Sequence, residues 1–152
     1  MVRKLAVVTL LLVPLACGGN DDGFSGPSQM PDIKGSFVGS LSVSILDGAV
    51  TLACDTRLDI GSQSDSTWHG VIHFTESNEL CDAGDTDAVS GTIGVDGHLT
   101  MTLDDSDLAN ECTTFSGSKV FAGSLTGSVL TVSTSVTCDD ESFDIRLTGT
   151  RS

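Results

Sequence analysis

The sequence predicts an all-β protein, built as a single antiparallel up-and-down barrel of about eight strands, with a two-sheet β-sandwich as the alternative. Apolar and polar residues alternate along most of the chain from Ile33 onward, which is typical of half-buried strands. Short turn motifs separate successive segments, which favours strands that pair with their neighbours in sequence. Closing such a sheet into a barrel buries one face and removes both free edges.

Each expected strand carries one apolar face, which we expect to point into the barrel. The expected inward residues are Phe37, Leu41, Val43, Ile45; Val50, Leu52, Cys54, Leu58, Ile60; Trp68, Gly70, Ile72, Phe74; Val89, Gly91, Ile93; Leu99, Met101, Leu103; Phe121, Gly123, Leu125; Leu130, Val132, Val136; and Phe143, Ile145, Leu147. The inward glycines either leave room for a ligand or let the strands bend. No stretch shows a convincing helical period over three turns.

Three turns predict the register of the strands that flank them. Asp47-Gly48 is typical of a type I′ turn, Gly127-Ser128 of a type II′ turn, and residues 95–97 of a three-residue loop with Gly97 in the left-handed region. Every pair that these turns place face to face joins apolar residues or glycine: Ile45–Val50, Val43–Leu52, Phe37–Leu58, Leu125–Leu130, Gly123–Val132, Ile93–Leu99 and Gly91–Met101. Turn chemistry and apolar pattern therefore agree.

The first 16 residues predict an export signal. Arg3 and Lys4 precede an apolar run over residues 5–15 that is too short to span a bilayer. The residues Leu15-Ala16-Cys17-Gly18-Gly19 resemble the lipobox of bacterial lipoproteins. This resemblance implies a diacylated Cys17 as the mature N-terminus and a chain that meets the membrane through that lipid alone. The alternative is an ordinary signal peptide beside an unpaired thiol.

The expected domain division follows from this signal. Residues 1–16 are the signal peptide, residues 17–32 the lipidated N-terminus and a flexible tether rich in Gly and Pro, and residues 33–152 the barrel domain. In the best-studied envelopes an Asp after the lipidated Cys resembles a retention signal for the inner membrane. Gly18 stands there in this chain, so we expect the outer membrane.

The chain has five cysteines, and lipidation of Cys17 leaves four for disulfides in an oxidising compartment. The meander places Cys54 near Cys81 and Cys112 near Cys138, with Cys54 roughly opposite Phe74. The rival pairing joins Cys81 to Cys112 and leaves Cys54 to Cys138. The spacing of these four residues is not typical of a zinc site.

Because the strands alternate in direction, thirteen of the 21 acidic residues fall at one end of the barrel. They are Asp47, Glu76, Glu79, Asp82, Asp85, Asp87, Asp104, Asp105, Asp107, Glu111, Asp139, Asp140 and Glu141, with Lys119 as the one base among them. We expect solvated loops that keep the domain soluble, and no cofactor. A Ca²⁺ site is the alternative, with Asp82, Asp85, Asp87, Asp104, Asp105 and Asp107 as its weak candidates.

Charge and motifs exclude several function classes. Asp and Glu total 21 against 7 Lys and Arg, a net charge of −14, which argues against nucleic acid as a partner. His69, His73 and His98 are expected at or near the surface. The chain holds no nucleophile motif such as Gly-x-Ser-x-Gly and no phosphate loop, so no enzyme is predicted.

Two short motifs resemble those of the lipocalins. Gly35-Ser36-Phe37 is similar to the Gly-x-Trp at the start of their first strand, with Phe37 in place of Trp. Arg151 resembles the basic residue that covers that aromatic ring. The resemblance implies a small barrel and a carrier-like role. We therefore expect a monomeric binding module for an apolar ligand or a basic partner protein. The alternatives are a structural surface lipoprotein without a ligand and a domain that binds divalent cations at the acidic end.

Overall fold

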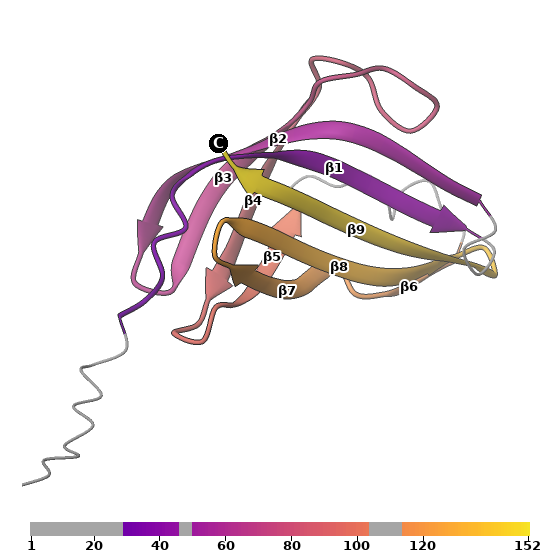
Figure 1. The fold of residues 1–152 in the computed structure, drawn as a ribbon. Coiled ribbons are helices and arrows are strands. Elements are labelled where there is room, and N and C mark those ends of the chain that lie inside the picture. The colour runs from indigo at the N-terminus through magenta and orange to yellow at the C-terminus, as the bar shows by residue number, and fades with distance from the viewer. Residues whose placement is uncertain (1–28, 46–49, 104–113) are drawn as a thin grey trace, which may run out of the picture.

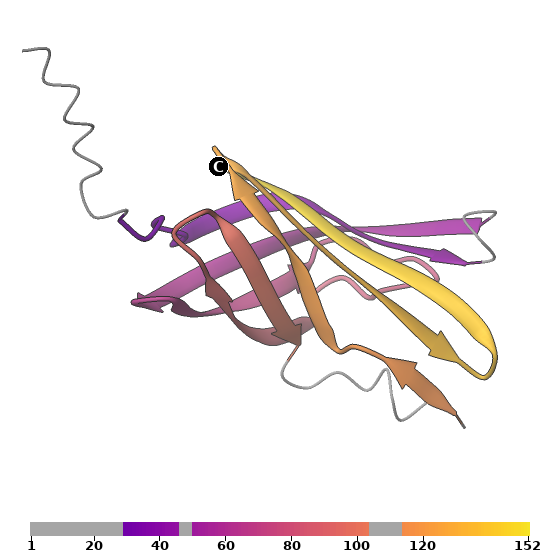
Figure 2. The same ribbon diagram turned by 90° about the horizontal axis from the view of Figure 1, so that it is seen from below.

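The computed structural model describes residues 29–45, 50–103 and 114–152, which form one antiparallel sheet that closes on itself (Figures 1 and 2). The strands are β1 (Gly35–Ile45), β2 (Val50–Ser64), β3 (Thr67–Phe74), β4 (Thr86–Ile93), β5 (His98–Leu103), β6 (Phe115–Gly117), β7 (Val120–Thr126), β8 (Val129–Cys138) and β9 (Glu141–Arg151). No helix occurs in these ranges. The predicted up-and-down barrel is confirmed.

One strand lies beyond the eight that close the barrel. The sheet order is β6-β8-β7-β5-β4-β3-β2-β1-β9, and β8 also pairs with β9. β7 pairs with the first half of β8 and β6 with its last residues, so β6 and β7 lie along the same edge. Gly117, at a φ of 122°, ends β6, and the Ser118 carbonyl accepts a hydrogen bond from Thr134 Oγ1 at 2.7 Å. No strand was predicted between Leu103 and Phe121, so β6 is an addition to the expected set.

The predicted registers are confirmed. Ile45 pairs with Val50, Ile93 with Leu99, and the other five predicted pairs are also present. Gly97 and Gly127 adopt positive φ values of 79° and 61°, as their turns require. The Asp47-Gly48 turn itself lies outside the described residues.

The core follows the predicted inward face. The largest fully buried side chains include Trp68, Phe37 and Phe121. Two further residues that the sequence analysis did not assign are also buried, Ile33 at 0% exposure and Thr56 at 2%. Thr56 belongs to the inward face of β2, and Ile33 precedes β1.

The two ends of the barrel differ, and we call them the closed end and the acidic end. At the closed end lie the turns at residues 65–66, 95–97 and 127–128, together with the chain before β1. Ile33 plugs this end, with its N–H donated to Gln63 Oε1 at 2.9 Å. Gln63 Nε2 donates to the Pro31 carbonyl at 3.0 Å, and Arg151 Nη2 donates to the Asp32 carbonyl at 2.6 Å. The β3–β4 loop and the β8–β9 turn lie at the acidic end.

Candidate functional site

The inward glycines lie against neighbouring backbone and do not hollow the barrel. A Cβ at Gly91 would collide with the Thr100 carbonyl and lie 2.7 Å from Trp68 Cζ2. A Cβ at Gly123 would collide with the Thr131 carbonyl, and one at Gly70 would lie 2.6 Å from the Asp59 carbonyl. These distances are below any real Cβ contact, so glycine is needed where neighbouring backbones approach closely. The space beside these glycines is already filled by protein atoms.

The acidic end gathers carboxylates without forming a metal site among the described residues. The predicted acids that the structure describes there are Glu76, Glu79, Asp82, Asp85, Asp87, Asp139, Asp140 and Glu141. No group of three or more His, Cys, Asp or Glu side chains within the described ranges could hold a metal ion. Asp47, Asp104, Asp105, Asp107 and Glu111 lie outside those ranges. The Ca²⁺ alternative therefore stays a prediction.

Some of these acids order the backbone instead. Glu76 Oε1 accepts the Asp55 N–H at 3.0 Å and Asn78 Nδ2 at 3.2 Å. Asn78 Nδ2 also donates to the Ala53 carbonyl at 2.7 Å, so the β3–β4 loop lies along the edge of β2. Asp139 Oδ1 accepts the Thr114 N–H at 2.8 Å. Carboxylates used in this way satisfy backbone groups that the sheet leaves unpaired.

A disulfide fastens the β3–β4 loop to the barrel wall. Cys54, buried on β2, is bonded to Cys81 with their Cα atoms 6.4 Å apart, which confirms the predicted pair and excludes its rival. Phe74 pairs with Thr56 and not with Cys54, so the expected position of Cys54 was wrong by two residues. The reason is that β2 continues to Ser64 and turns back into β3 at residues 65–66, which moves the centre of this hairpin toward Phe74. A β-bulge lies between Ile60 and Ser62 in the same hairpin. Cys138 is disulfide-bonded, and Cys112 lies outside the described residues.

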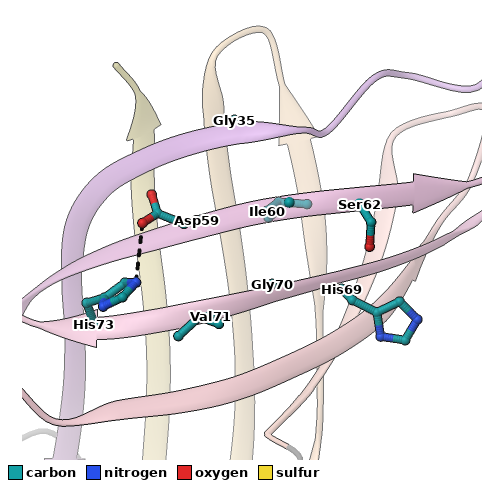
Figure 3. A pocket seen from close by; sticks show the side chains of 9 residues that line it. Gly35, Asp59, Ile60, Ser62, His69, Gly70, Val71 and His73 are labelled. Carbon is teal, nitrogen blue, oxygen red and sulfur yellow. Dashed lines mark ion pairs between the residues drawn. The ribbon is translucent and has the colours of Figure 1, made fainter.

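A hollow of about 510 Å³ opens on the outer wall formed by β1, β2 and β3 (Figure 3). Its lining includes the side chains of Asp59, His69, Val71 and His73, together with Gly35 and Gly61. Gly61 sits in the β-bulge, and a Cβ there would meet nothing within 4 Å. Missing side chains on an outward face thus create the hollow.

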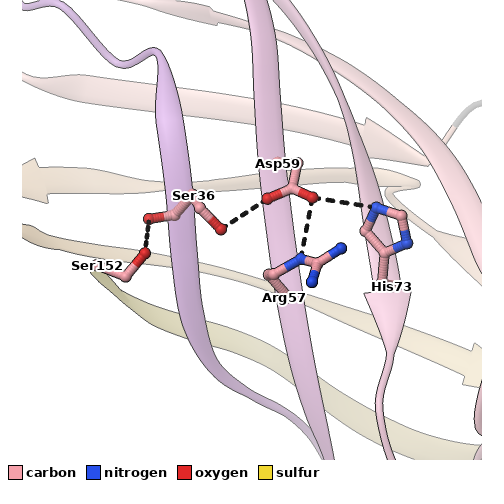
Figure 4. Close-up of polar contacts among 5 residues, drawn as sticks. All are labelled: Ser36, Arg57, Asp59, His73 and Ser152. Carbon is pink, nitrogen blue, oxygen red and sulfur yellow. Dashed lines mark hydrogen bonds and ion pairs between the residues drawn. The ribbon is translucent and has the colours of Figure 1, made fainter.

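Asp59 is the centre of the polar cluster beside this hollow (Figure 4). Its Oδ1 accepts Ser36 Oγ at 2.6 Å, and its Oδ2 lies 3.0 Å from Arg57 Nε and 3.3 Å from His73 Nε2. The hydrogen bond from Ser36, followed by the hydrogen bond and charge of Arg57 and the charge of His73, lowers the pKa of Asp59 below 3.8, against the opposing effect of burial. Asp59 is therefore ionised at neutral pH.

The order of contacts in this cluster suits binding better than nucleophilic catalysis. In a Ser-His-Asp triad the His accepts the Ser proton and the carboxylate orients the His. Here Ser36 and His73 both contact the carboxylate of Asp59. The carbonyl of Ser36 also accepts the N–H of Ser152 at 3.0 Å and the Ser152 hydroxyl at 3.3 Å, the second of which Figure 4 shows. These bonds fix the start of β1 to the C-terminal end of β9.

The Asp59 cluster was not predicted, although the turn at Asp47-Gly48 implied one of its contacts. The register set by Asp47-Gly48 places Ser36 opposite Asp59, as observed. His73 reaches Asp59 from β3, and its position depends on the β-bulge, which no residue pattern had predicted. His69 and His98 are exposed and His73 is half-buried, as expected.

At the closed end, the Arg151 guanidinium lies over the Phe37 ring at 5.1 Å from its centroid. This is the contact that the lipocalin resemblance implied, whereas membership of that family stays a prediction. Cys17, the expected lipidation site, lies outside the described residues. The described part of the chain contains no helix long and apolar enough to cross a membrane.

Comparison with known proteins found no family model, no curated protein and no solved structure that matches this chain.

Proposed function

We propose that this chain is a lipid-anchored protein of the bacterial cell envelope, whose small barrel binds a partner protein through its outer surface and has no catalytic role. The lipobox-like residues 15–19 support the anchor, and the four cysteines that remain support an oxidising compartment. The observation that carries the binding mode is the filled interior, because Gly91 and Gly123 are packed against neighbouring backbone.

A partner protein fits this interior better than an apolar ligand does. An eight-stranded barrel is only wide enough to be filled by side chains or to hold one small ligand. Trp68, Phe37 and Phe121 occupy the interior at 0–2% exposure. We therefore place the binding surface outside, where a ligand need not displace packed side chains.

The hollow on the outer wall is the surface that we propose for this contact. Val71 provides exposed apolar area, and the ionised Asp59 lies beside it. A net charge of −14 favours the approach of a basic partner. Partner side chains could enter the space left by Gly61 without moving the backbone.

Mass spectrometry of the mature N-terminus tests the anchor. Protein purified from its host should begin at Cys17, and that residue should carry a diacylglyceryl group. A Cys17→Ser variant should keep the signal peptide and lose the lipid. A mature N-terminus at another residue, without acyl groups, would contradict the proposed anchor.

Site-specific photo-cross-linking in living host cells tests the binding surface. A photo-reactive residue at Val71 should give one discrete adduct, and the same residue at Val129, an exposed valine of β8, should not. Gly61→Trp fills the hollow and should abolish the adduct, while Val120→Trp, at an exposed position of β7 away from the hollow, should leave it. Equal adducts from both positions, or none, would contradict the proposal and favour the structural role without a ligand.

Native mass spectrometry of the same preparation addresses the apolar ligand. We expect the mass of the acylated chain alone. A stoichiometric apolar compound that dissociates only on unfolding would overturn the filled-barrel argument and restore the carrier function.

A further inference from the structure

The closed end of the barrel is where the chain leaves the domain toward its N-terminus. Ile33 is buried at 0% exposure, and Met30 packs against the same core. Hydrogen bonds from Gln63 to the Pro31 carbonyl and from Arg151 to the Asp32 carbonyl hold this segment on both sides. Both views show the first described residues at the end opposite the β8–β9 turn (Figures 1 and 2). The fold therefore fixes the exit point of the tether.

The tether is short compared with the barrel. Twelve residues, 17–28, separate the expected anchor residue from the described chain. A flexible chain of that length has a root-mean-square span of about 20 Å and cannot exceed about 40 Å. The 11 residues of β1 alone extend over about 35 Å from the closed end toward the acidic end. To bring the acidic end to the membrane, the tether would have to run back along almost its full contour length.

The distribution of charge also favours the closed end as the end nearer to the membrane. The described charged side chains at the closed end are nearly balanced: Asp32, Asp65 and Asp96 with Lys34 and Arg151. Lys119, directly before β7, is the one Lys or Arg that the structure describes in the loops at the acidic end. The acids described there are Glu76, Glu79, Asp82, Asp85, Asp87, Asp139, Asp140 and Glu141. Anionic headgroups repel carboxylates within roughly a Debye length, about 8 Å at physiological salt.

From these observations we infer that the closed end is the surface that faces the lipid headgroups and that the acidic end points away from the bilayer. This inference rests on the proposed lipid anchor. The hollow beside Asp59 and Val71 opens on the side wall, and its lining extends to Gly35 at the start of β1. In this orientation the acidic loops are the part of the protein that lies furthest from the membrane.

Quenching of introduced tryptophans by vesicles with nitroxide-labelled headgroups measures this orientation. Ser128→Trp places the probe in an exposed turn at the closed end, and Ala83→Trp places it in an exposed loop at the acidic end. The native Trp68 is 0% exposed and supplies a constant background in both variants. We expect the added fluorescence at position 128 to be quenched at least twofold more than at position 83. Anionic lipid should widen the ratio, and high salt should narrow it.

Two preparations allow the orientation to be tested independently of the proposed natural lipid anchor. In the first, the chain carries its natural lipid from the host. In the second, a chain that begins at Cys17 is coupled to a maleimide lipid, and peptide mapping selects the product that carries the lipid at Cys17 and not at Cys112; Cys54, Cys81 and Cys138 are disulfide-bonded. Absence of natural acylation would contradict the proposed function, while the second preparation still reports the orientation.

Second probe positions guard against a variant that fails to fold. Val95→Trp lies in another closed-end turn and Glu79→Trp in the acidic β3–β4 loop, and both residues are exposed. The same twofold ratio is expected for this pair. Equal quenching at the two ends, or stronger quenching at the acidic end, would overturn the inferred orientation.

Discussion

The two ends of this barrel are stabilised by different physical means. At the closed end, Ile33 is buried and hydrogen bonds hold the chain on both sides of it. At the acidic end, the inward residues Val43 and Phe143 are only partly buried, and Cys54–Cys81 joins a loop to the wall. A covalent link takes the place of burial where long acidic loops repel one another. We therefore expect loss of burial to destabilise the closed end most and loss of the disulfide to destabilise the acidic end most.

Removal of the Cys54–Cys81 bond should give the largest effect. The bond closes a loop of 27 residues, which in the chain-entropy model corresponds to about 3.5 kcal/mol of stability. The double variant Cys54→Ala with Cys81→Ala should lose about that free energy of unfolding in urea. Ala53→Ser with Ala83→Ser, at two exposed positions close to these cysteines, is the control and should leave the midpoint unchanged. Equal midpoints for the double variant and the native chain would show that packing alone holds this loop.

Truncation of the plug should give the next largest effect. Ile33→Ala removes a side chain of 0% exposure and should cost about 3 kcal/mol, because a cavity remains in a rigid core. The matched control is Val43→Ala, at a partly buried inward position of the other half, which should cost about 1 kcal/mol. Urea midpoints measure both. A smaller loss for Ile33→Ala than for Val43→Ala would reverse the contrast between the ends.

The fold was predictable where turn chemistry and apolar period point to the same register. The Gly127-Ser128 turn and the residues around Gly97 fix their hairpins locally, so the observed pairs follow from the sequence. Ile33 was not predicted, because a single apolar residue after Pro31 carries no period; its burial depends on Gln63, some thirty residues away in sequence. The Asp59 cluster depends on the β-bulge at Gly61. A bulge shifts the phase of the alternation by one residue, but residues 62–64 are all polar, so the apolar pattern does not show the shift.

Replacement of Arg151 should destabilise the closed end less than replacement of Ile33. Its guanidinium covers the Phe37 ring and donates to the Asp32 carbonyl. Arg151→Ala should lower the free energy of unfolding by about 1–2 kcal/mol through the lost cation–π and hydrogen-bond contacts. Arg146→Ala, an exposed arginine of the same strand, should change it by less than about 0.5 kcal/mol. Equal effects of the two substitutions in thermal unfolding would mean that Arg151 contributes only as a surface residue.

The smallest expected effect comes from Asp59, on the outer wall of the half of the barrel that includes the closed end. Its pKa is lowered in the folded state below 3.8, first by the hydrogen bond from Ser36 and then by Arg57 and His73. A lowered carboxyl pKa adds stability above the unfolded pKa, and that stability disappears as the pH falls through the folded pKa.

Asp59→Asn should therefore reduce stability at pH 7, and the difference from the native chain should vanish once the pH falls below the lowered pKa of Asp59. The side chain is 39% exposed, so solvent screening limits the loss to below about 1 kcal/mol. Asp96→Asn, in an exposed closed-end turn, is the control for simple removal of a negative charge, because it leaves the contacts to Ser36 and Arg57 intact. Urea unfolding of both variants from pH 2 to pH 7 measures the difference. A constant offset across that range would mean that the amide changes packing and that the ionised form of Asp59 adds nothing to the closed end.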